Sequence, residues 1–194
     1  MSGRVIAGLA KGRRLKLVPG DGTRPIMDRV KEALFSILGS GVYDSIWLDL
    51  FAGTGAVGIE ALSRGAEYSL FVDTDRAAIQ TILENLKTTG LAEQSRVLRT
   101  DAFTLLAASP QMQYDYIYVA PPQYKGLWQK TLALLEKNSA WIPEGCQVIV
   151  QIDPKEQAPV TLKQLVEVDE RRYGNTLLWF FESVPPEPEA PEEN

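Results

Sequence analysis

From residue 46 onward, the chain alternates short apolar runs with amphipathic stretches. The apolar runs predict strands at 46–51, 68–73, 95–100, 114–119 and 146–152. Segments with the periodicity of a helix lie between them, near 56–64, 76–89, 102–108 and 126–137. Short apolar strands separated by helices are typical of a parallel sheet with both faces covered. The pattern therefore predicts an α/β fold.

The end of the chain follows a different pattern. Two strand-like runs, at 164–173 and 176–182, are joined by Gly174 and Asn175, which predicts an antiparallel hairpin. A mostly parallel, seven-stranded sheet with such a hairpin is, by analogy, the Rossmann-like fold of class I methyltransferases. The apolar residues at 179–181 do not alternate with polar ones, so we expect them in the core rather than on a binding surface.

The N-terminal region precedes this alternation and predicts two elements. Residues 4–18 are expected to form a small β-hairpin, with Gly12 providing the backbone freedom of its turn. After a loop, Asp28 is expected to cap a helix over 29–38. The predicted apolar face of this helix comprises Val30, Ala33, Leu34, Ile37 and Leu38.

Composition excludes several classes of site. The chain of 194 residues contains no histidine and a single cysteine, Cys146, which excludes histidine-based triads, internal disulfides and zinc sites built from histidine or cysteine. We expect no metal site. A hydrophobic content of 45% suits one domain with a real core, and no apolar run has the length of a membrane span or a signal peptide. We therefore expect a cytoplasmic protein, monomeric and without a membrane partner.

Charge is distributed unevenly along the chain. The net charge is −5, yet residues 1–31 contain eight basic and two acidic residues, whereas residues 185–194 are acidic and rich in proline. We divide the chain into a basic N-terminal extension (1–25), a methyltransferase domain (26–184) and a tail (185–194) that we expect to be disordered.

A glycine-rich loop follows the first predicted parallel strand, within LDLFAGTGAVGIEAL. Gly53, Gly55 and Gly58 form a G-x-G-x-x-G pattern, and Asp73 follows 20 residues after Gly53. This is the fingerprint of a dinucleotide site with an acidic partner for the ribose, and S-adenosylmethionine sites share it. A turn that only packs the helix on the strand is the alternative.

Asp49 favours S-adenosylmethionine over a dinucleotide. It precedes the glycines, where its carboxylate would repel a pyrophosphate but attract the ammonium and sulfonium groups of S-adenosylmethionine. Asp73 is expected to accept hydrogen bonds from the ribose, and Asp101 to reach the adenine amino group. Helix or loop capping is the alternative role for Asp49 and Asp101. The complete predicted cofactor site is Arg24, Asp49, Phe51, Gly53, Gly55, Asp73 and Asp101.

Several segments resemble the RsmD family of bacterial 16S rRNA guanine-N2 methyltransferases. They are residues 4–38 with their TRP and DRV-x-EALF motifs, the LDLFAGTGAVGIEALSRGA segment, FVDTD, and ENL at 84–86. The resemblance covers roughly residues 3–153. It implies a class I methyltransferase fold, S-adenosylmethionine as cofactor, and guanine N2 of 16S rRNA in the small ribosomal subunit as acceptor.

One motif departs from the family pattern. After the fourth strand the family has D/N-P-P-Y, and this chain has APPQY, which is Ala120, Pro121, Pro122, Gln123 and Tyr124. The resemblance assigns the catalytic role to these positions. The family's Asp or Asn accepts a hydrogen bond from the weakly nucleophilic amine and orients it, which the side chain of Ala120 cannot do. Gln123 offers an amide oxygen, and Tyr124 or Trp128 offers a ring to stack on the base.

The basic side chains of the extension are expected to contact rRNA phosphates, an electrostatic interaction that is independent of sequence. They are Arg4, Lys11, Arg13, Arg14 and Lys16. A solvated charged surface is the alternative. Because Pro25 restricts the backbone beside Arg24, we expect Arg24 near the cofactor or the target base.

Three readings of the altered motif stay open: an active enzyme with a rearranged site, a slow enzyme, and a cofactor- and RNA-binding protein without catalysis. Two other classes are weaker. An NAD-binding oxidoreductase needs a pyrophosphate site, which Asp49 opposes. A DNA adenine methyltransferase also uses a Pro-Pro motif, but the N-terminal segment with TRP argues against it.

Overall fold

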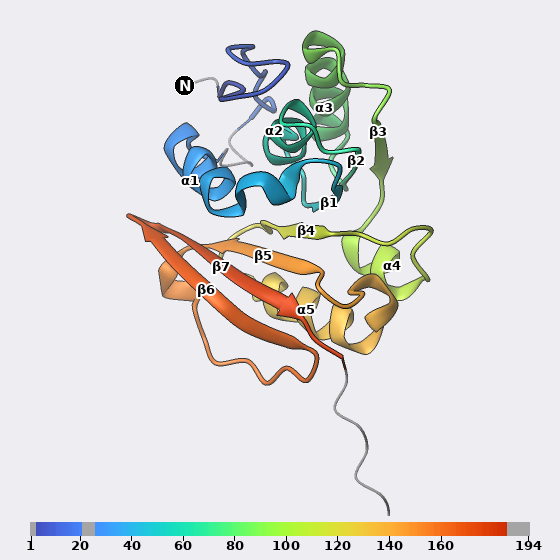
Figure 1. Ribbon diagram of the computed structural model, residues 1–194, viewed down its shortest axis with the longest axis vertical. Helices are drawn as coiled ribbons and strands as arrows, with labels where there is room; N and C mark the ends of the chain where they lie inside the picture. Colours follow the sequence, from blue (N-terminus) through green and yellow to red (C-terminus); the bar gives the residue numbers. More distant parts are fainter. Residues whose placement is uncertain (1–2, 21–25, 186–194) are drawn as a thin grey trace, which may run out of the picture.

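The computed structural model describes residues 3–20 and 26–185, and it contains one seven-stranded sheet (Figure 1). Its strands are β1 (Ile46–Leu50), β2 (Tyr68–Asp73), β3 (Ser95–Arg99), β4 (Tyr116–Val119), β5 (Gln147–Ile152), β6 (Leu165–Tyr173) and β7 (Thr176–Ser183). The spatial order is β3-β2-β1-β4-β5-β7-β6. Strands β1 to β5 pair in parallel, and β7 is antiparallel to both β5 and β6. The predicted parallel sheet with a C-terminal antiparallel hairpin is confirmed.

Helices cover both faces of the sheet. They are α1 (Asp28–Leu38), α2 (Ala56–Ser63), α3 (Arg76–Thr89), α4 (Ala102–Ala107) and α5 (Leu127–Lys137), with the short 3-10 helices η1 (Gly39–Val42), η2 (Ser139–Trp141) and η3 (Pro154–Glu156). Helices α1, α2 and α3 lie on one face, and α4 and α5 lie on the other (Figure 1). Each face has its own cluster of buried apolar side chains, because strands that are covered on both sides bury residues of both faces.

The order in which the chain adds strands to the sheet reverses at β1, and this reversal creates a place for a ligand. Strand β1 has β2 on one side and β4 on the other. The connections from β1 through β3 therefore run one way across the sheet, and those after β4 run the other way. In open α/β sheets such a point leaves a crevice outside the carboxyl ends of the strands, where ligands bind.

The aromatic run at 179–181 is buried, as predicted. Trp179 and Phe181 belong to the apolar cluster under α4 and α5, whereas Phe180 belongs to the cluster on the opposite face. Successive residues of β7 point to opposite faces of the sheet, and each face there is covered by its own apolar cluster. The outer strand β6 has exposed Val166 and Val168 instead.

The N-terminal segment, defined here as residues 3–20, differs from the regular hairpin we expected. It doubles back, with an isolated antiparallel bridge between Arg4 and Arg14 and no further strand assigned within it. Two backbone hydrogen bonds accompany this bridge, from the N–H of Val5 to the carbonyl of Arg13 at 2.9 Å and from the N–H of Leu15 to the carbonyl of Gly3 at 2.8 Å. Other backbone groups of the segment bind helix side chains. Ile6 donates its N–H to Glu60 of α2 at 2.8 Å, and Lys16 donates its N–H to Asn85 of α3 at 2.7 Å.

Helix α1 corrects two expectations. Met27, not Asp28, precedes its first turn, and the Asp28 carboxylate pairs with the Arg4 guanidinium at 3.4 Å instead of capping the helix. Ile37, expected in the core, is 39% exposed. Phe35 is buried instead and stacks on Trp47 of β1, with ring centroids 5.5 Å apart.

No helix in residues 3–20 and 26–185 has the length and apolar character needed to cross a membrane. Within the same ranges, no group of three or more His, Cys, Asp or Glu side chains has an arrangement suited to a metal ion.

Candidate active site

A cavity of about 540 Å³ lies at the carboxyl edge of the parallel strands. Its lining draws on the segments that follow β1, β2, β3 and β4, on the end of β5 and on the start of β7. Val18 and Pro19 of the N-terminal segment also contribute. The cavity therefore occupies the crevice that the strand order predicts.

The glycine loop forms one wall, and its glycines have different roles. At Gly53, where φ is +54°, a Cβ would have nothing within 4 Å, so the backbone is open to the cavity. Gly55 does not line the cavity. A Cβ there would lie 3.3 Å from Phe71 and Ile82, so its glycine serves the packing of the loop on β2 and α3. Phe51, which lines the cavity, also has a positive φ of 62°.

Asp49 is buried at the end of β1 and also lines the cavity. Its carboxylate accepts a hydrogen bond from the N–H of Gly58, in the first turn of α2, at 3.2 Å. Burial raises its pKa well above the ordinary value, and the charge of Asp73 acts in the same direction, while the Gly58 N–H opposes them. A carboxylate in this state is stabilised by a cation placed beside it.

Asp73 and Asp101 line the same cavity at the ends of β2 and β3. Asp73 accepts hydrogen bonds from the N–H groups of Gly53 and Asp75, both at 2.9 Å, and so holds the glycine loop in position. Asp101 caps α4 by accepting from the N–H of Thr104 at 3.0 Å. A carboxylate has about four acceptor positions. Asp73 and Asp101 can therefore each accept a hydrogen bond from a ligand in addition to these backbone bonds.

The APPQY motif forms the opposite wall. Ala120, Pro121, Pro122 and Gln123 line the cavity. Tyr124 is not part of its lining among the described residues. Its hydroxyl donates to Asp153 at 2.8 Å and its N–H to Glu156 at 2.6 Å, which ties this end of the motif to η3.

The expectation that Trp128 stacks on a base is wrong. Its side chain is 1% exposed and packs against Trp179 beneath the sheet, with ring centroids 5.5 Å apart. Leu127, one residue earlier at the start of α5, lines the cavity instead. The helical rotation between consecutive residues turns one toward the site and the other into the core.

Sequence reasoning missed several residues of the lining, among them Phe103, Tyr118, Gln151 and Thr176. Phe103 meets Phe51 edge to face, with centroids 6.1 Å apart. The hydroxyl of Tyr118 donates to the Gln151 side-chain oxygen. The sequence could have indicated Tyr118, because it stands on β4 two residues before Ala120, which directly follows the strand, and alternate residues of extended chain share a face. No local signal identifies Gln151, which belongs to a neighbouring strand.

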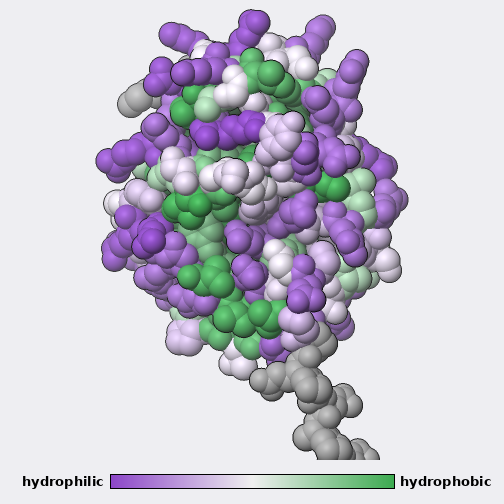
Figure 2. All heavy atoms as spheres, viewed as in Figure 1, coloured by the Kyte–Doolittle hydropathy of each residue, from purple (hydrophilic) through white to green (hydrophobic). Residues whose placement is uncertain are grey.

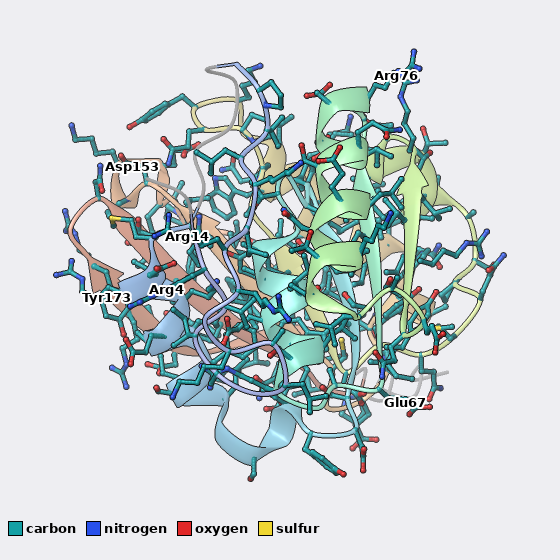
Figure 3. All side chains as sticks on the ribbon, turned by 90° about the horizontal axis from the view of Figure 1, so that it is seen from above. Arg4, Arg14, Glu67, Arg76, Asp153 and Tyr173 are labelled. Carbon is teal, nitrogen blue, oxygen red and sulfur yellow. The ribbon has the colours of Figure 1, made fainter. Side chains whose placement is uncertain are left out.

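The basic residues of the N-terminal segment fall into two groups. Arg4 and Lys16 form exposed ion pairs, with Asp28 at 3.4 Å and with Glu84 at 2.6 Å. Lys11, Arg13 and Arg14 are exposed and form no ion pair within residues 3–20 and 26–185. Figure 3 shows Arg4 and Arg14 on this segment, and hydrophilic side chains project along the top of the face in Figure 2. Arg24 lies outside the described residues.

Buried polar groups attach the N-terminal segment to the domain. The fully buried Glu60 accepts from the N–H groups of Ile6 and Ala7, and lies 3.4 Å from the Nζ of Lys31. Burial lowers the pKa of Lys31, against the charge of Glu60, which raises it. The segment is therefore held to α1 and α2 by specific contacts.

Comparisons with known proteins agree with this architecture. A family model described as Conserved hypothetical protein 95 matches residues 3–182. The putative rRNA methyltransferase YlbH of Bacillus subtilis is 41% identical over 175 residues, which cover 89% of this chain and 95% of that protein. Ribosomal RNA small subunit methyltransferase D of Escherichia coli strain K12 is 36% identical over 156 residues, 80% of this chain and 77% of that protein.

Solved structures give the same result. The putative methyltransferase yhhF from Escherichia coli superposes with a TM-score of 0.82 at 32% identity, covering 94% of this chain and 98% of that one. An RNA methyltransferase from Salinibacter ruber, in complex with S-adenosyl-L-homocysteine, shares the fold with a TM-score of 0.63 at 17% identity, over 88% of this chain and all of that one. The chain therefore belongs to the family described as Conserved hypothetical protein 95, the RsmD family of rRNA methyltransferases.

Proposed function

We propose that this protein transfers a methyl group from S-adenosylmethionine to the exocyclic N2 of a guanine in 16S rRNA. The main observation behind this proposal is that a single cavity has two chemically different walls. One wall holds the glycine loop with Asp49, Asp73 and Asp101, and the other holds the proline pair of the APPQY motif. A cofactor on the first wall and a base on the second would meet inside a single cavity.

The acidic wall suits S-adenosylmethionine. Asp73 would accept from the ribose hydroxyls and Asp101 from the adenine amino group, while Gly53 lets the ligand approach the backbone. Asp49 would stabilise the positive charges of the amino acid end. S-adenosylmethionine, when bound, supplies a methyl group made electrophilic by the sulfonium. Arg24 and Phe51 complete the proposed cofactor site, Phe51 from the cavity wall.

A dinucleotide fits this wall poorly. In dinucleotide sites, the pyrophosphate lies on the N-terminus of the helix after the glycine loop. Here the Asp49 carboxylate already accepts the N–H of Gly58 in that first turn. Two negative groups would then share a buried site, which is unfavourable. We therefore rank an NAD-binding oxidoreductase below a methyltransferase.

The proline wall would bind the target base. The amine lone pair of guanine is delocalised into the ring, so catalysis depends on holding the amine with its lone pair toward the methyl group. The backbone carbonyls of Ala120 and Pro121 are candidate acceptors, and so is the side chain of Gln123. The missing acceptor at Ala120 favours one second candidate, a protein that binds the cofactor and RNA without catalysis.

The extension 1–25 would bind rRNA phosphates, with the domain 26–184 carrying the chemistry. Lys11, Arg13 and Arg14 are exposed and available for this role. The exposed ion pairs of Arg4 and Lys16 are weak in water, so phosphate can replace their carboxylate partners at little cost.

Methyl transfer to small ribosomal subunits tests the proposal. Purified protein is incubated with S-adenosylmethionine carrying a labelled methyl group and with 30S subunits from cells that lack this protein. We expect label in N2-methylguanosine of the 16S rRNA, found by mass analysis. Subunits that already carry the modification are the substrate control, and Asp73→Ala is the cofactor control. Firm cofactor binding without transfer would favour the second candidate, and tighter binding of NAD would contradict the cofactor assignment.

A further inference from the structure

Position 120, where the family has Asp or Asn, lies next to strand β5. Strands β4 and β5 pair in parallel, with Tyr118 beside Ile149 and Val119 beside Val150. Continuing this register by one residue sets Ala120 beside Gln151. Neighbouring strands lie about 4.8 Å apart, and paired residues point to the same face. Ala120 and Gln151 both line the cavity, in agreement with this extended register.

Tyr118 holds the Gln151 side chain in one orientation. Tyr118 stands on β4 two residues before Ala120, which follows the last residue of the strand, and both line the cavity. Its hydroxyl donates a hydrogen bond to the side-chain oxygen of Gln151. Burial raises the pKa of Tyr118 well above its ordinary value, with the nearby charge of Asp49 adding to the effect, so the hydroxyl keeps the proton that it donates.

We propose that Gln151 supplies the side-chain acceptor that Ala120 cannot, and that Tyr118 is its positioning residue. An amide oxygen has two lone pairs. The Tyr118 hydroxyl uses one, and the second is free to accept from the exocyclic amine of a base held against Pro121. This assignment rests on the proposed function and names the residue that orients its substrate.

The role of Gln151 is orientation, and the transfer balances without a base in the protein. The guanine N2 forms a bond to the methyl carbon as the carbon–sulfur bond breaks, and that electron pair stays on sulfur as a neutral thioether. The surplus proton on N2 passes to water. An amide oxygen does not take up this proton at neutral pH, so Gln151 acts by holding the amine and by stabilising its growing positive charge.

Gln123 is the competing acceptor, but the structure holds the side chains of the two glutamines differently. Gln151 belongs to a strand and is fixed by Tyr118. Gln123 belongs to the loop after the prolines, and no hydrogen bond of its side chain is found among the described residues. Groups on rigid elements with a second residue behind them keep a productive geometry more closely than groups on loops. This favours Gln151.

Variants of Gln151 test the assignment in the 30S methylation assay. Gln151→Met removes the acceptor at similar volume, and we expect kcat to fall by about 10²–10³, the usual effect of losing one such partner. KM and the affinity for S-adenosylmethionine, measured by calorimetry, should stay within about threefold of wild type. Gln151→Glu keeps an oxygen at the site and should retain more activity than Gln151→Met. Tyr118→Phe should lower kcat with little change in KM.

Two further variants separate the outcomes. Gln147→Ala, on the same strand at its far end, is the matched control and should leave kcat unchanged. Ala120→Asn in the Gln151→Met background should restore activity, because it returns the acceptor to the family's position. If the wild type is active, Gln151→Met leaves kcat unchanged and Gln123→Ala loses activity, the assignment of Gln151 is overturned while the proposed function stands. Wild type that transfers no methyl group would overturn the proposed function and the assignment with it.

Discussion

The side-chain amide of Asn85 donates a hydrogen bond to the backbone oxygen of Thr54 at 3.0 Å, and so connects helix α3 to the glycine loop. The same amide accepts from the N–H of Lys16 at 2.7 Å and donates to its carbonyl oxygen at 3.1 Å. Asn85 is 1% exposed. One buried side chain therefore links the basic N-terminal segment to the wall of the proposed cofactor site.

Asn85→Ala should weaken two functions at once. It leaves backbone groups of Lys16 and Thr54 without partners, which costs about 1–3 kcal/mol of stability for each buried group. We also expect weaker binding of both S-adenosylmethionine and rRNA, because the loop and the segment lose their shared support. Urea unfolding and calorimetry measure these effects.

Asn138→Ala is the matched control for this link. Asn138 also donates to two backbone oxygens, those of Leu106 and Ala108, but on the other face of the sheet. Its loss should lower stability and leave cofactor affinity unchanged. Equal effects of the two variants on cofactor affinity would show that Asn85 has only a general structural role.

Asp49→Asn should stabilise the free protein near neutral pH while weakening cofactor binding. The raised pKa of Asp49 means that the native state binds its proton more tightly than the unfolded chain does. Stability from this group therefore falls as pH rises from the ordinary value of 3.8 toward the native pKa. Asparagine removes the buried charge and keeps an oxygen for the Gly58 N–H.

The test compares urea unfolding of wild type and Asp49→Asn across a pH series, with calorimetry of S-adenosylmethionine binding. The wild type alone should lose stability over the interval above pH 3.8. A variant with the same pH dependence as wild type, or with undiminished cofactor affinity, would contradict the role given to Asp49.

The double variant Arg13→Ala, Arg14→Ala should reduce the salt dependence of rRNA binding. Each phosphate contact that is lost lowers the slope of log K against log salt by about 0.7–0.9. The control is Lys87→Ala with Lys137→Ala, which removes the same charge from the last turns of α3 and α5, at residues that do not line the cavity. Equal slopes for the two variants would return Arg13 and Arg14 to the solvated-surface interpretation.

Glu60→Gln should destabilise the protein strongly. It removes the buried partner of Lys31 and weakens the hydrogen bonds from Ile6 and Ala7, and breaking a buried pair costs about 3–5 kcal/mol. Glu84→Gln, which affects only the exposed pair with Lys16, should cost less than about 1 kcal/mol. Similar losses in urea unfolding for both would mean that the buried cluster does not hold the N-terminal segment.

Local pattern was sufficient for much of the domain. The five parallel strands, the helices between them and the C-terminal hairpin appear where apolar periodicity and Gly174 with Asn175 predict them, within a few residues at each end. The glycine loop and the APPQY motif also lie at strand ends that meet at one edge. Such features depend on residues close in sequence and on the rule that parallel strands end together, so they can be derived without the fold.

Only the tertiary structure decided the features whose partners are distant in the chain. The segment expected to form a hairpin over 4–18 does double back, but it is also held by bonds to Glu60 and Asn85, which no local pattern reveals. The β4–β5 pairing, extended by one residue beyond Val119 and Val150, sets Gln151 beside Ala120, across 31 positions of sequence. The periodicity of apolar residues shows which face of its own helix or strand a side chain occupies. Its partner on that face depends on tertiary packing, which brings residues together whatever their separation along the chain.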